Sequence, residues 1–301
     1  MKVPAAFLVG AASHTGCVRV ANEDDFLLGA LLPPGPELLL AAVADGMGGA
    51  AGGGEASRAA LRALGRAVLD AASPVPLADR LAAGFAGAAV RVLEHAAAVP
   101  ALRDMGTTLT AVCIAGAEAF VGHIGDTRLY LLRGGQSEQT TVDHAVREPD
   151  NLLTRCVGGG QGRREPDLRR LSLEPGDRLL LCSDGIWSVL AAHQLARLAA
   201  QGAPQVAAEA LVDAALAAGG PDNATAVVVE WRPAAAGAPP RDLALPREER
   251  QDVGGGWPAP MSLRAPWWPW CLFGLAATLV GFVVLRLTCD FDAWLWLRSH
   301  W

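Results

Sequence analysis

Acidic residues beside glycines are the residues of this sequence best suited to chemistry. Asp45, Asp126 and Asp184 each adjoin a glycine and follow an apolar run, and Glu23 and Asp222 lie at similar junctions. A carboxylate at the end of a buried strand costs free energy unless its charge is compensated. A single Asp-Gly pair is most often a turn, whereas five such carboxylates in one domain indicate convergence on a cation.

The types of these residues indicate which cation. Carboxylate oxygens without Cys or His partners are the ligands that Mg²⁺ and Mn²⁺ prefer. Gly46, next to Asp45, would let a backbone carbonyl approach an ion closely. The six cysteines are scattered, with no spacing typical of structural zinc, and we expect them to be reduced.

The elements that must position these carboxylates alternate between strands and pairs of helices. Apolar, β-branched runs predict strands at residues 5–11, 26–32, 38–44, 107–114, 117–124, 128–132, 178–183 and 224–230. Helical spacing of Ala, Leu and Arg predicts helices at residues 51–72, 77–98, 190–200 and 204–218. Because the helices come in pairs without regular βαβ alternation, the expected fold class is α+β, with helices packed on antiparallel sheets.

The sequence changes character after residue 232. We expect one domain over residues 1–232, then a Pro-, Ala- and Gly-rich linker over residues 233–264. Residues 265–285 carry no charge, and about 20 helical residues span the roughly 30 Å of a bilayer core. The sequence therefore predicts a transmembrane helix at residues 265–286 and a short Trp-rich tail at residues 287–301.

Charge argues against a nucleic-acid partner and orients the predicted span. The formal net charge is −6, which argues against the basic surface of a nucleic-acid-binding protein. Three arginines precede the predicted span and two follow it, so the weak positive-inside bias places the N-terminal domain in the cytoplasm: Arg247, Arg250 and Arg264, then Arg286 and Arg298.

Taken in order, the motifs resemble those of the metal-dependent Ser/Thr protein phosphatases of the type 2C (PPM) group, in their bacterial form. The resemblance covers residues 5–231. It rests on Arg19 through Asp24, Asp45 through Gly49, Gly54 through Ser57, Met105 through Thr108, Gly125 through Arg128, Asp143-His144, Leu153 through Arg155, Ser183 through Gly185, and Asp222-Asn223.

The resemblance implies a four-layer α/β/β/α sandwich with a binuclear Mn²⁺ or Mg²⁺ centre at one end. Asp45 would bridge the two ions and Gly46 would offer its carbonyl. Asp184 and Asp222 would hold one ion, and Glu23 would serve the other, directly or through water. The remaining implied roles are phosphate binding by Arg19, orientation of water by Asp24, and a possible third ion at Asp126 and Asp184.

Under this resemblance, water activated by paired ions attacks phosphorus, and no side-chain nucleophile is needed. Cys182 is expected to be a core residue, and His123 and His144 are expected to be structural. Two departures from the family pattern stand out. Met47 occupies the place of a His in eukaryotic members, and only ten residues separate His144 from Arg155, where bacterial relatives carry a longer flap.

Three functions remain open at this point. The first is an active, membrane-tethered phosphatase that removes phosphate from protein Ser and Thr residues and opposes a Ser/Thr kinase. The second is a catalytically weak relay that binds a phosphoprotein at the membrane, which the short flap supports. The third is a phosphatase for phosphorylated anti-sigma-factor antagonists.

Overall fold

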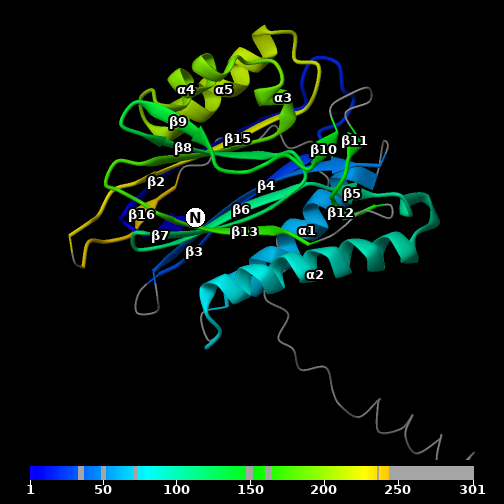
Figure 1. Cartoon of the computed structure of the whole chain (residues 1–301), viewed down its shortest axis with the longest axis horizontal. Helices are drawn as coiled ribbons and strands as arrows, with labels where there is room; N and C mark the ends of the chain where they lie inside the picture. Colours follow the sequence, from blue (N-terminus) through cyan, green and yellow to red (C-terminus); the bar gives the residue numbers. More distant parts are fainter. Residues whose placement is uncertain are drawn as a thin grey trace, which may run out of the picture. The chain divides into compact units, whose positions relative to one another are not determined.

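Two antiparallel β-sheets form the centre of the folded domain in the computed structural model (Figure 1). The structure describes residues 1–32, 37–48, 52–70, 73–146, 152–159, 165–235 and 237–243. The first sheet has seven strands: β12 (Val157–Gly158), β5 (Gly106–Thr107), β4 (Leu38–Met47), β6 (Leu109–Ala115), β7 (Glu118–Ile124) and β13 (Asp167–Ser172), with β3 (Asp24–Leu31) also paired to β4.

The second sheet has five strands, in the order β2 (Phe7–His14), β15 (Ala224–Trp231), β14 (Arg178–Cys182), β8 (Arg128–Arg133) and β9 (Gln136–Gln139). Two short two-stranded sheets lie outside the main sheets: β1 (Lys2–Val3) with β16 (Arg241–Asp242), and β10 (Ala145–Val146) with β11 (Leu152–Leu153).

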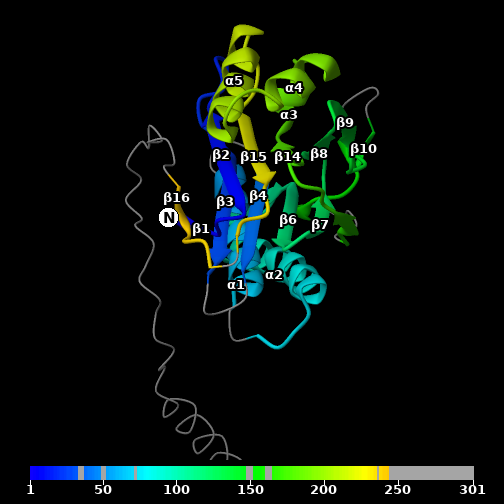
Figure 2. The ribbon, with the colours of Figure 1, turned by 90° about the vertical axis from the view of Figure 1, so that its left-hand side faces the viewer.

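Helices cover the two outer faces of the sheets, as both ribbon views show (Figures 1 and 2). On the seven-stranded sheet lie α1 (Gly52–Val68) and α2 (Leu77–Ala98), followed by the 3-10 turn η1 (Pro100–Leu102). On the five-stranded sheet lie α3 (Asp184–Trp187), α4 (Ala192–Ala199) and α5 (Pro204–Ala217). The predicted α/β/β/α layering is therefore present.

Strand β4 shows why the sandwich needs a continuous apolar strand. Leu38, Leu40, Ala42 and Ala44 face α1 and α2, whereas Leu39, Ala41 and Val43 face the other sheet. This alternation is the two-residue period of a strand. Because both faces of β4 are buried, the strand reads as an unbroken apolar run in the sequence.

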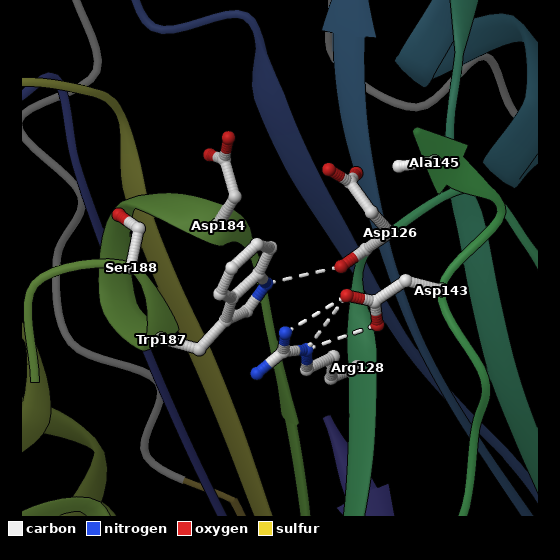
Figure 3. A pocket seen from close by; sticks show the side chains of 7 residues that line it. All are labelled: Asp126, Arg128, Asp143, Ala145, Asp184, Trp187 and Ser188. Carbon is white, nitrogen blue, oxygen red and sulfur yellow. Dashed lines mark hydrogen bonds and ion pairs between the residues drawn. The ribbon is translucent and has the colours of Figure 1, made fainter. Parts of the chain in front are cut away.

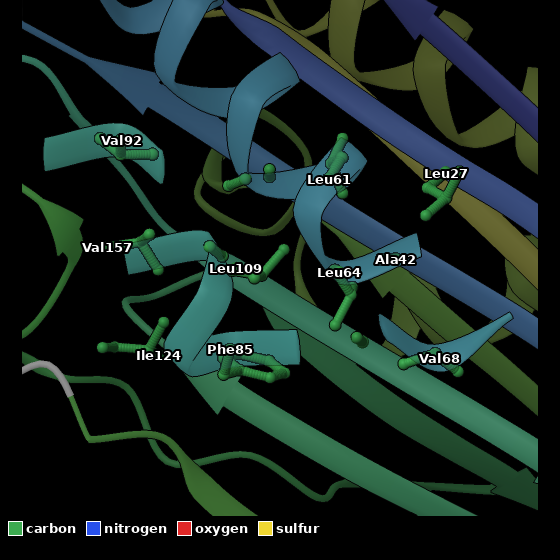
Figure 4. Close-up of a cluster of buried hydrophobic side chains, with 14 of the residues drawn as sticks. Leu27, Ala42, Leu61, Leu64, Val68, Phe85, Val92, Leu109, Ile124 and Val157 are labelled. Carbon is green, nitrogen blue, oxygen red and sulfur yellow. The ribbon is translucent and has the colours of Figure 1, made fainter. Parts of the chain in front are cut away.

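The core beneath α1 and α2 is drawn in Figure 4. Leu61 and Leu64 from α1 and Phe85 from α2 meet Leu109 and Ile124 of the sheet. A second core fills the space between the sheets, and a third lies under α4 and α5. These three layers of packing hold the strand ends that carry the acidic residues.

The domain extends beyond its predicted boundary at residue 232. Within the predicted linker, β16 pairs with β1, and the Arg241 side chain donates a hydrogen bond to the carbonyl of Ala5. Leu243 packs against the core between the sheets, and its N–H binds the carbonyl of Met1. A linker prediction that starts at residue 233 is therefore too early, because Pro and Ala content hides this short edge strand.

The predicted transmembrane helix at residues 265–286 and the tail at residues 287–301 lie outside the described residues. Within the described part of the chain, no helix combines the length and apolar character needed to cross a membrane.

Candidate active site

Asp45 and Gly46 lie inside the last residues of β4, whereas the sequence predicts that they follow the strand. Asp45 stands opposite Asp24 of β3 in the strand register. Thr108 accepts a hydrogen bond from the Asp45 N–H with its hydroxyl and donates its own N–H to the Asp45 carbonyl. The backbone around Asp45 is therefore fixed from both neighbouring strands.

Gly46 occupies a place that admits no side chain. A Cβ there would lie 2.2 Å from the carbonyl oxygen of Gly53 and 2.7 Å from that of Glu23. The Gly46 N–H donates to the same Glu23 carbonyl at 3.2 Å. Close backbone approach explains the glycine at this position.

Ser183 and Asp184 follow β14, and Asp184 is the first residue of α3. The carboxyl group of Asp184 lies close enough to those of Asp222 and Asp45 to interact with them electrostatically. Ser183, at the junction of β14 and α3, donates a 2.6 Å hydrogen bond from its hydroxyl to Asp24 and accepts the N–H of Thr225 at 3.0 Å. These contacts bring together carboxylates from both sheets, as the sequence predicts.

Arg19 and Asp222 form an ion pair of 2.7 Å between the guanidinium and the carboxylate. The loop that carries Arg19 is tied to the Asp222 segment by Asn223, whose side-chain amide donates to the carbonyls of Thr15 and Ala21. The Asn223 side-chain oxygen accepts the N–H of Glu23 at 2.8 Å. One buried Asn thus positions both Arg19 and Glu23 relative to Asp222.

Burial makes this cluster of carboxylates electrostatically costly. Burial, followed by the charges of neighbouring carboxylates, raises the pKa of Asp45 well above its usual range and also raises that of Asp184. Burial raises the pKa of Asp24 to about 7, although hydrogen bonds from Ser183 and Thr225 oppose the shift. Such shifts are typical of functional sites.

Three buried carboxylate oxygens in the described residues have no hydrogen-bond partner: Glu23 Oε1, Asp24 Oδ1 and Asp184 Oδ1. Unpartnered buried oxygens of this kind require an explanation. A divalent cation supplies one, because it prefers oxygen ligands and compensates their charge. The donor set therefore fits Mg²⁺ or Mn²⁺. Within the described ranges, no three His, Cys, Asp or Glu side chains are already grouped closely enough to hold a metal ion.

Asp126 lies beside this cluster, across a cavity of about 300 Å³ whose other walls include Asp184 and Trp187 (Figure 3). It follows Gly125, whose φ of +108° is left-handed and whose N–H donates to His144. Burial, followed by the charge of Asp184, raises the pKa of Asp126 to about 7. The structure thus brings Asp126 near Asp184, as the sequence predicts for a further ion.

The two histidines that the sequence interprets as structural are engaged in fold contacts. His123 is buried between Thr110 and the carbonyl of Val142, and burial lowers its pKa to about 4. His144 receives the Gly125 N–H and hydrogen-bonds to Asp167. Both rings therefore brace the turn before Asp126.

Cys182 is fully buried in β14, and burial raises the pKa of its thiol. A buried thiol of raised pKa is a poor nucleophile, which agrees with its prediction as a core residue. Cys17, Cys113 and Cys182 are free thiols in the described part of the chain.

Sequence reasoning missed Trp187 and the positioning contacts of Asn223 and Ser183. Trp187 donates its indole N–H to the backbone carbonyl of Asp126 at 3.0 Å. Its only signal in the sequence is its place three residues after Asp184, one helical turn along.

Comparisons with known proteins agree with the geometry. The sequence profile of protein phosphatase 2C matches residues 20–218. The chain is 39% identical over 244 residues to the serine/threonine protein phosphatase PstP of Mycobacterium tuberculosis, covering 73% of this chain and 44% of that relative. It therefore spans less than half the length of that relative.

Two further matches extend over most or nearly all of the matched protein. The protein phosphatase PhpP of Streptococcus pneumoniae is 31% identical over 208 residues, which cover 62% of this chain and 83% of PhpP. A crystal structure of the PstP catalytic domain in complex with two manganese ions superposes with a TM-score of 0.67 at 34% identity, covering 75% of this chain and 99% of that one. With its profile match, motif order and sandwich architecture, this chain belongs to the protein phosphatase 2C family.

Proposed function

We propose that the folded domain hydrolyses phosphoserine and phosphothreonine on proteins in a metal-dependent reaction. The observation that carries this proposal is the group of carboxylates around Asp45, which has three buried oxygens without partners, with Arg19 beside it. Family membership supports it, and the curated relatives PstP and PhpP are named protein phosphatases.

The residues present fit two Mn²⁺ or Mg²⁺ ions, and the PstP structure with two manganese ions supports this number. Asp45 would serve both ions, and Gly46 would offer its carbonyl oxygen as a ligand. Asp184 and Asp222 would hold one, and Glu23 the other. When bound, such ions polarise a phosphoryl group and lower the pKa of water enough to make it a nucleophile at neutral pH.

Arg19 supplies the phosphate contact in this proposal. Its side chain is 53% exposed and ends 2.7 Å from Asp222, so it can reach a phosphate entering from solvent beside the carboxylates. A guanidinium offers paired N–H donors that match two phosphate oxygens, which orients the phosphoryl group for attack.

Asp24 has a different part, because it is buried behind the other carboxylates and held by Ser183 at 2.6 Å. From this position it would accept a hydrogen bond from a water that the ions hold and would fix the direction of attack. Positioning groups of this kind, behind the ligands themselves, tune the reactivity of a metal site.

The wider setting is also a proposal. The uncharged stretch at residues 265–285 supports anchorage by one membrane-spanning helix, with the phosphatase domain on the cytoplasmic side. Anchorage raises the local concentration of substrates at the membrane. A bacterial Ser/Thr kinase that phosphorylates proteins there would be the enzyme it opposes.

The test is hydrolysis of a phosphothreonine peptide by the full chain in Mn²⁺, compared between wild type and Asp45→Asn. The proposal expects Asp45→Asn to lose at least about a hundredfold in kcat/KM, because the neutral amide no longer balances two cations. The matched control is Asp213→Asn, the same exchange at an exposed position on α5, which should keep wild-type activity. Equal activity in all three proteins would overturn the proposal.

A further inference from the structure

Three carboxylates line the cavity beside Asp126: Asp126, Asp143 and Asp184. Asp126 lies in the turn between β7 and β8, and Asp184 follows β14, which pairs with β8 so that Arg128 stands opposite Cys182. Strand pairing therefore brings the Asp126 and Asp184 segments together, and the contacts of the turn itself decide how Asp126 is held against α3. Figure 3 shows the carboxyl groups of Asp126 and Asp184 above the ring of Trp187.

Trp187 connects these two segments directly. It is the last residue of α3, the short helix that begins with Asp184, and its indole N–H donates to the Asp126 carbonyl at 3.0 Å. The same residue is thus one helical turn from one carboxylate and hydrogen-bonded to the backbone of the other. This hydrogen bond adds to the pairing of Arg128 in β8 with Cys182 in β14, and it acts on the turn that carries Asp126.

Arg128 fixes the indole ring in turn. Its guanidinium carbon lies 3.6 Å from the centroid of the Trp187 ring, a cation–π geometry. The Arg128 side chain also forms a forked ion pair with Asp143, with distances of 3.0 Å to Oδ1 and 2.8 Å to Oδ2, and donates to the Tyr130 hydroxyl at 3.0 Å. The ion pair is largely buried, with side chains 12% and 9% exposed, so its geometry is well defined.

We propose that Trp187 is a positioning residue that fixes the turn carrying Asp126 against α3, and with it the final spacing of the Asp126 and Asp184 carboxylates. The Arg128–Asp143 pair holds its ring in place. The consequence is that a divalent cation bound between these carboxylates depends on the indole N–H, although Trp187 itself contacts no ion. This inference rests on the proposed function, since it concerns an ion next to the proposed binuclear centre.

The test is a Mn²⁺ titration of the full chain followed by electron paramagnetic resonance, which counts bound ions and resolves their affinities. Asp126→Ala should abolish binding of those Mn²⁺ ions that depend on Asp126, and the comparison with wild type identifies this class of ions. Trp187→Phe keeps an aromatic ring against Arg128 and removes the indole N–H. We expect it to weaken that same class about tenfold, the lower end of the range for groups that orient metal ligands, and to leave the other ions unchanged.

Two further variants separate positioning from general damage. Arg128→Lys keeps the charge but cannot form the forked pair with Asp143, and it should weaken the same class of ions. Trp231→Phe makes the same indole-to-phenyl exchange in β15, away from Asp126, and should bind Mn²⁺ as wild type does. If Trp187→Phe fails to fold, as judged by circular dichroism, Arg128→Lys decides the question.

The inference is overturned if folded Trp187→Phe or Arg128→Lys binds Mn²⁺ with wild-type number and affinity, or if Asp126→Ala loses no class of ions. Peptide hydrolysis by the same wild-type preparation distinguishes failure of this inference from failure of the proposed function. Active wild type with unaffected Mn²⁺ binding in Trp187→Phe overturns the inference alone. Wild type that neither binds Mn²⁺ nor hydrolyses the peptide overturns the proposed function with it.

Discussion

Asp24 and Asp126 illustrate what the fold demands of single residues at this site. Burial raises the pKa of each to about 7, from an ordinary value of 3.8. In the folded protein without metal, both groups therefore hold a proton between about pH 4 and pH 7, where the unfolded chain has released it. Folding stability must then fall as the pH rises through this interval.

This sign gives a first prediction. In EDTA, the thermal unfolding temperature of the protein should decrease from pH 5 to pH 7.5 as Asp24 and Asp126 lose their protons. Mn²⁺ should raise the unfolding temperature most strongly at the higher pH. Asp126→Asn should show a shallower decrease, because one of the two groups no longer titrates. Scanning calorimetry at several pH values measures this, and an unfolding temperature that rises with pH equally in wild type and variant would contradict the account.

A second prediction concerns Arg19. Replacement by Ala removes the charge-assisted contact to phosphate, each such bond being worth about 1.5–3 kcal/mol, so kcat/KM for a phosphothreonine peptide should fall by about 10- to 100-fold. Arg197→Ala, at an exposed position on α4, is the matched control and should retain wild-type kinetics. Steady-state kinetics in Mn²⁺ decides, and wild-type kcat/KM in Arg19→Ala would remove this residue from the site.

At the scale of elements, close approach between helix and sheet is the feature most sensitive to change. Strand β2 meets α5 at Gly10, where a Cβ would lie 2.2 Å from the backbone nitrogen of Gln205. Gln205 also bonds to both backbone groups of Ala11 with its side chain. At Gly10 the helix therefore meets the strand by backbone contact, which adds to the side-chain core under α5.

A third prediction follows. Gly10→Ala should destabilise the domain by about 1–3 kcal/mol or more, because overpacking must push α5 away from β2. Gly87→Ala is the opposite case, since a Cβ at Gly87 of α2 meets no atom within 4 Å. It should stabilise the domain by about 0.5–1 kcal/mol through helix propensity. Urea unfolding of the two variants measures the contrast, and similar effects in both would refute this packing argument.

The elements that periodicity predicts best are those with strong apolar patterns. The sequence predicts α2 at residues 77–98 with the observed bounds, and β4 and β15 differ only at their ends. The exposed edge strand β13 and the two-residue strands β1 and β16 escape prediction, because their pairing depends on distant partners and their residues are mostly exposed.

The candidate site divides in a similar way. Its carboxylates were predictable from residue type, glycine neighbours and motif order. Asn223 and Ser183 stood in recognised motifs, yet their contacts with the Arg19 loop and with Asp24 depend on how the sheets face each other. Trp187 binds a backbone carbonyl, which any residue offers, so no pattern in the sequence could have indicated its partner.

At the scale of the whole molecule, membrane anchorage is the feature left for experiment. The proposed helix at residues 265–286 predicts that the full chain sediments with membranes after cell fractionation and resists extraction by carbonate at high pH. A chain ending at Glu248 keeps β16 and should remain in the supernatant with its phosphatase activity. Identical distribution of the two chains would contradict anchorage by this segment.

Metal-dependent hydrolysis is the claim on which the account of the molecule rests. The most direct measurement is the rate of phosphothreonine-peptide hydrolysis by the full chain after its metal is removed with EDTA and then restored by Mn²⁺ or Mg²⁺. The account predicts no turnover in EDTA and recovery on restoring Mn²⁺, Mg²⁺ or both, because buried carboxylate oxygens of Glu23, Asp24 and Asp184 have no hydrogen-bond partner without bound cations. Unchanged turnover in EDTA, or a folded protein inactive with every ion, would contradict it, and the second result would favour a relay that binds a phosphoprotein without cleaving it.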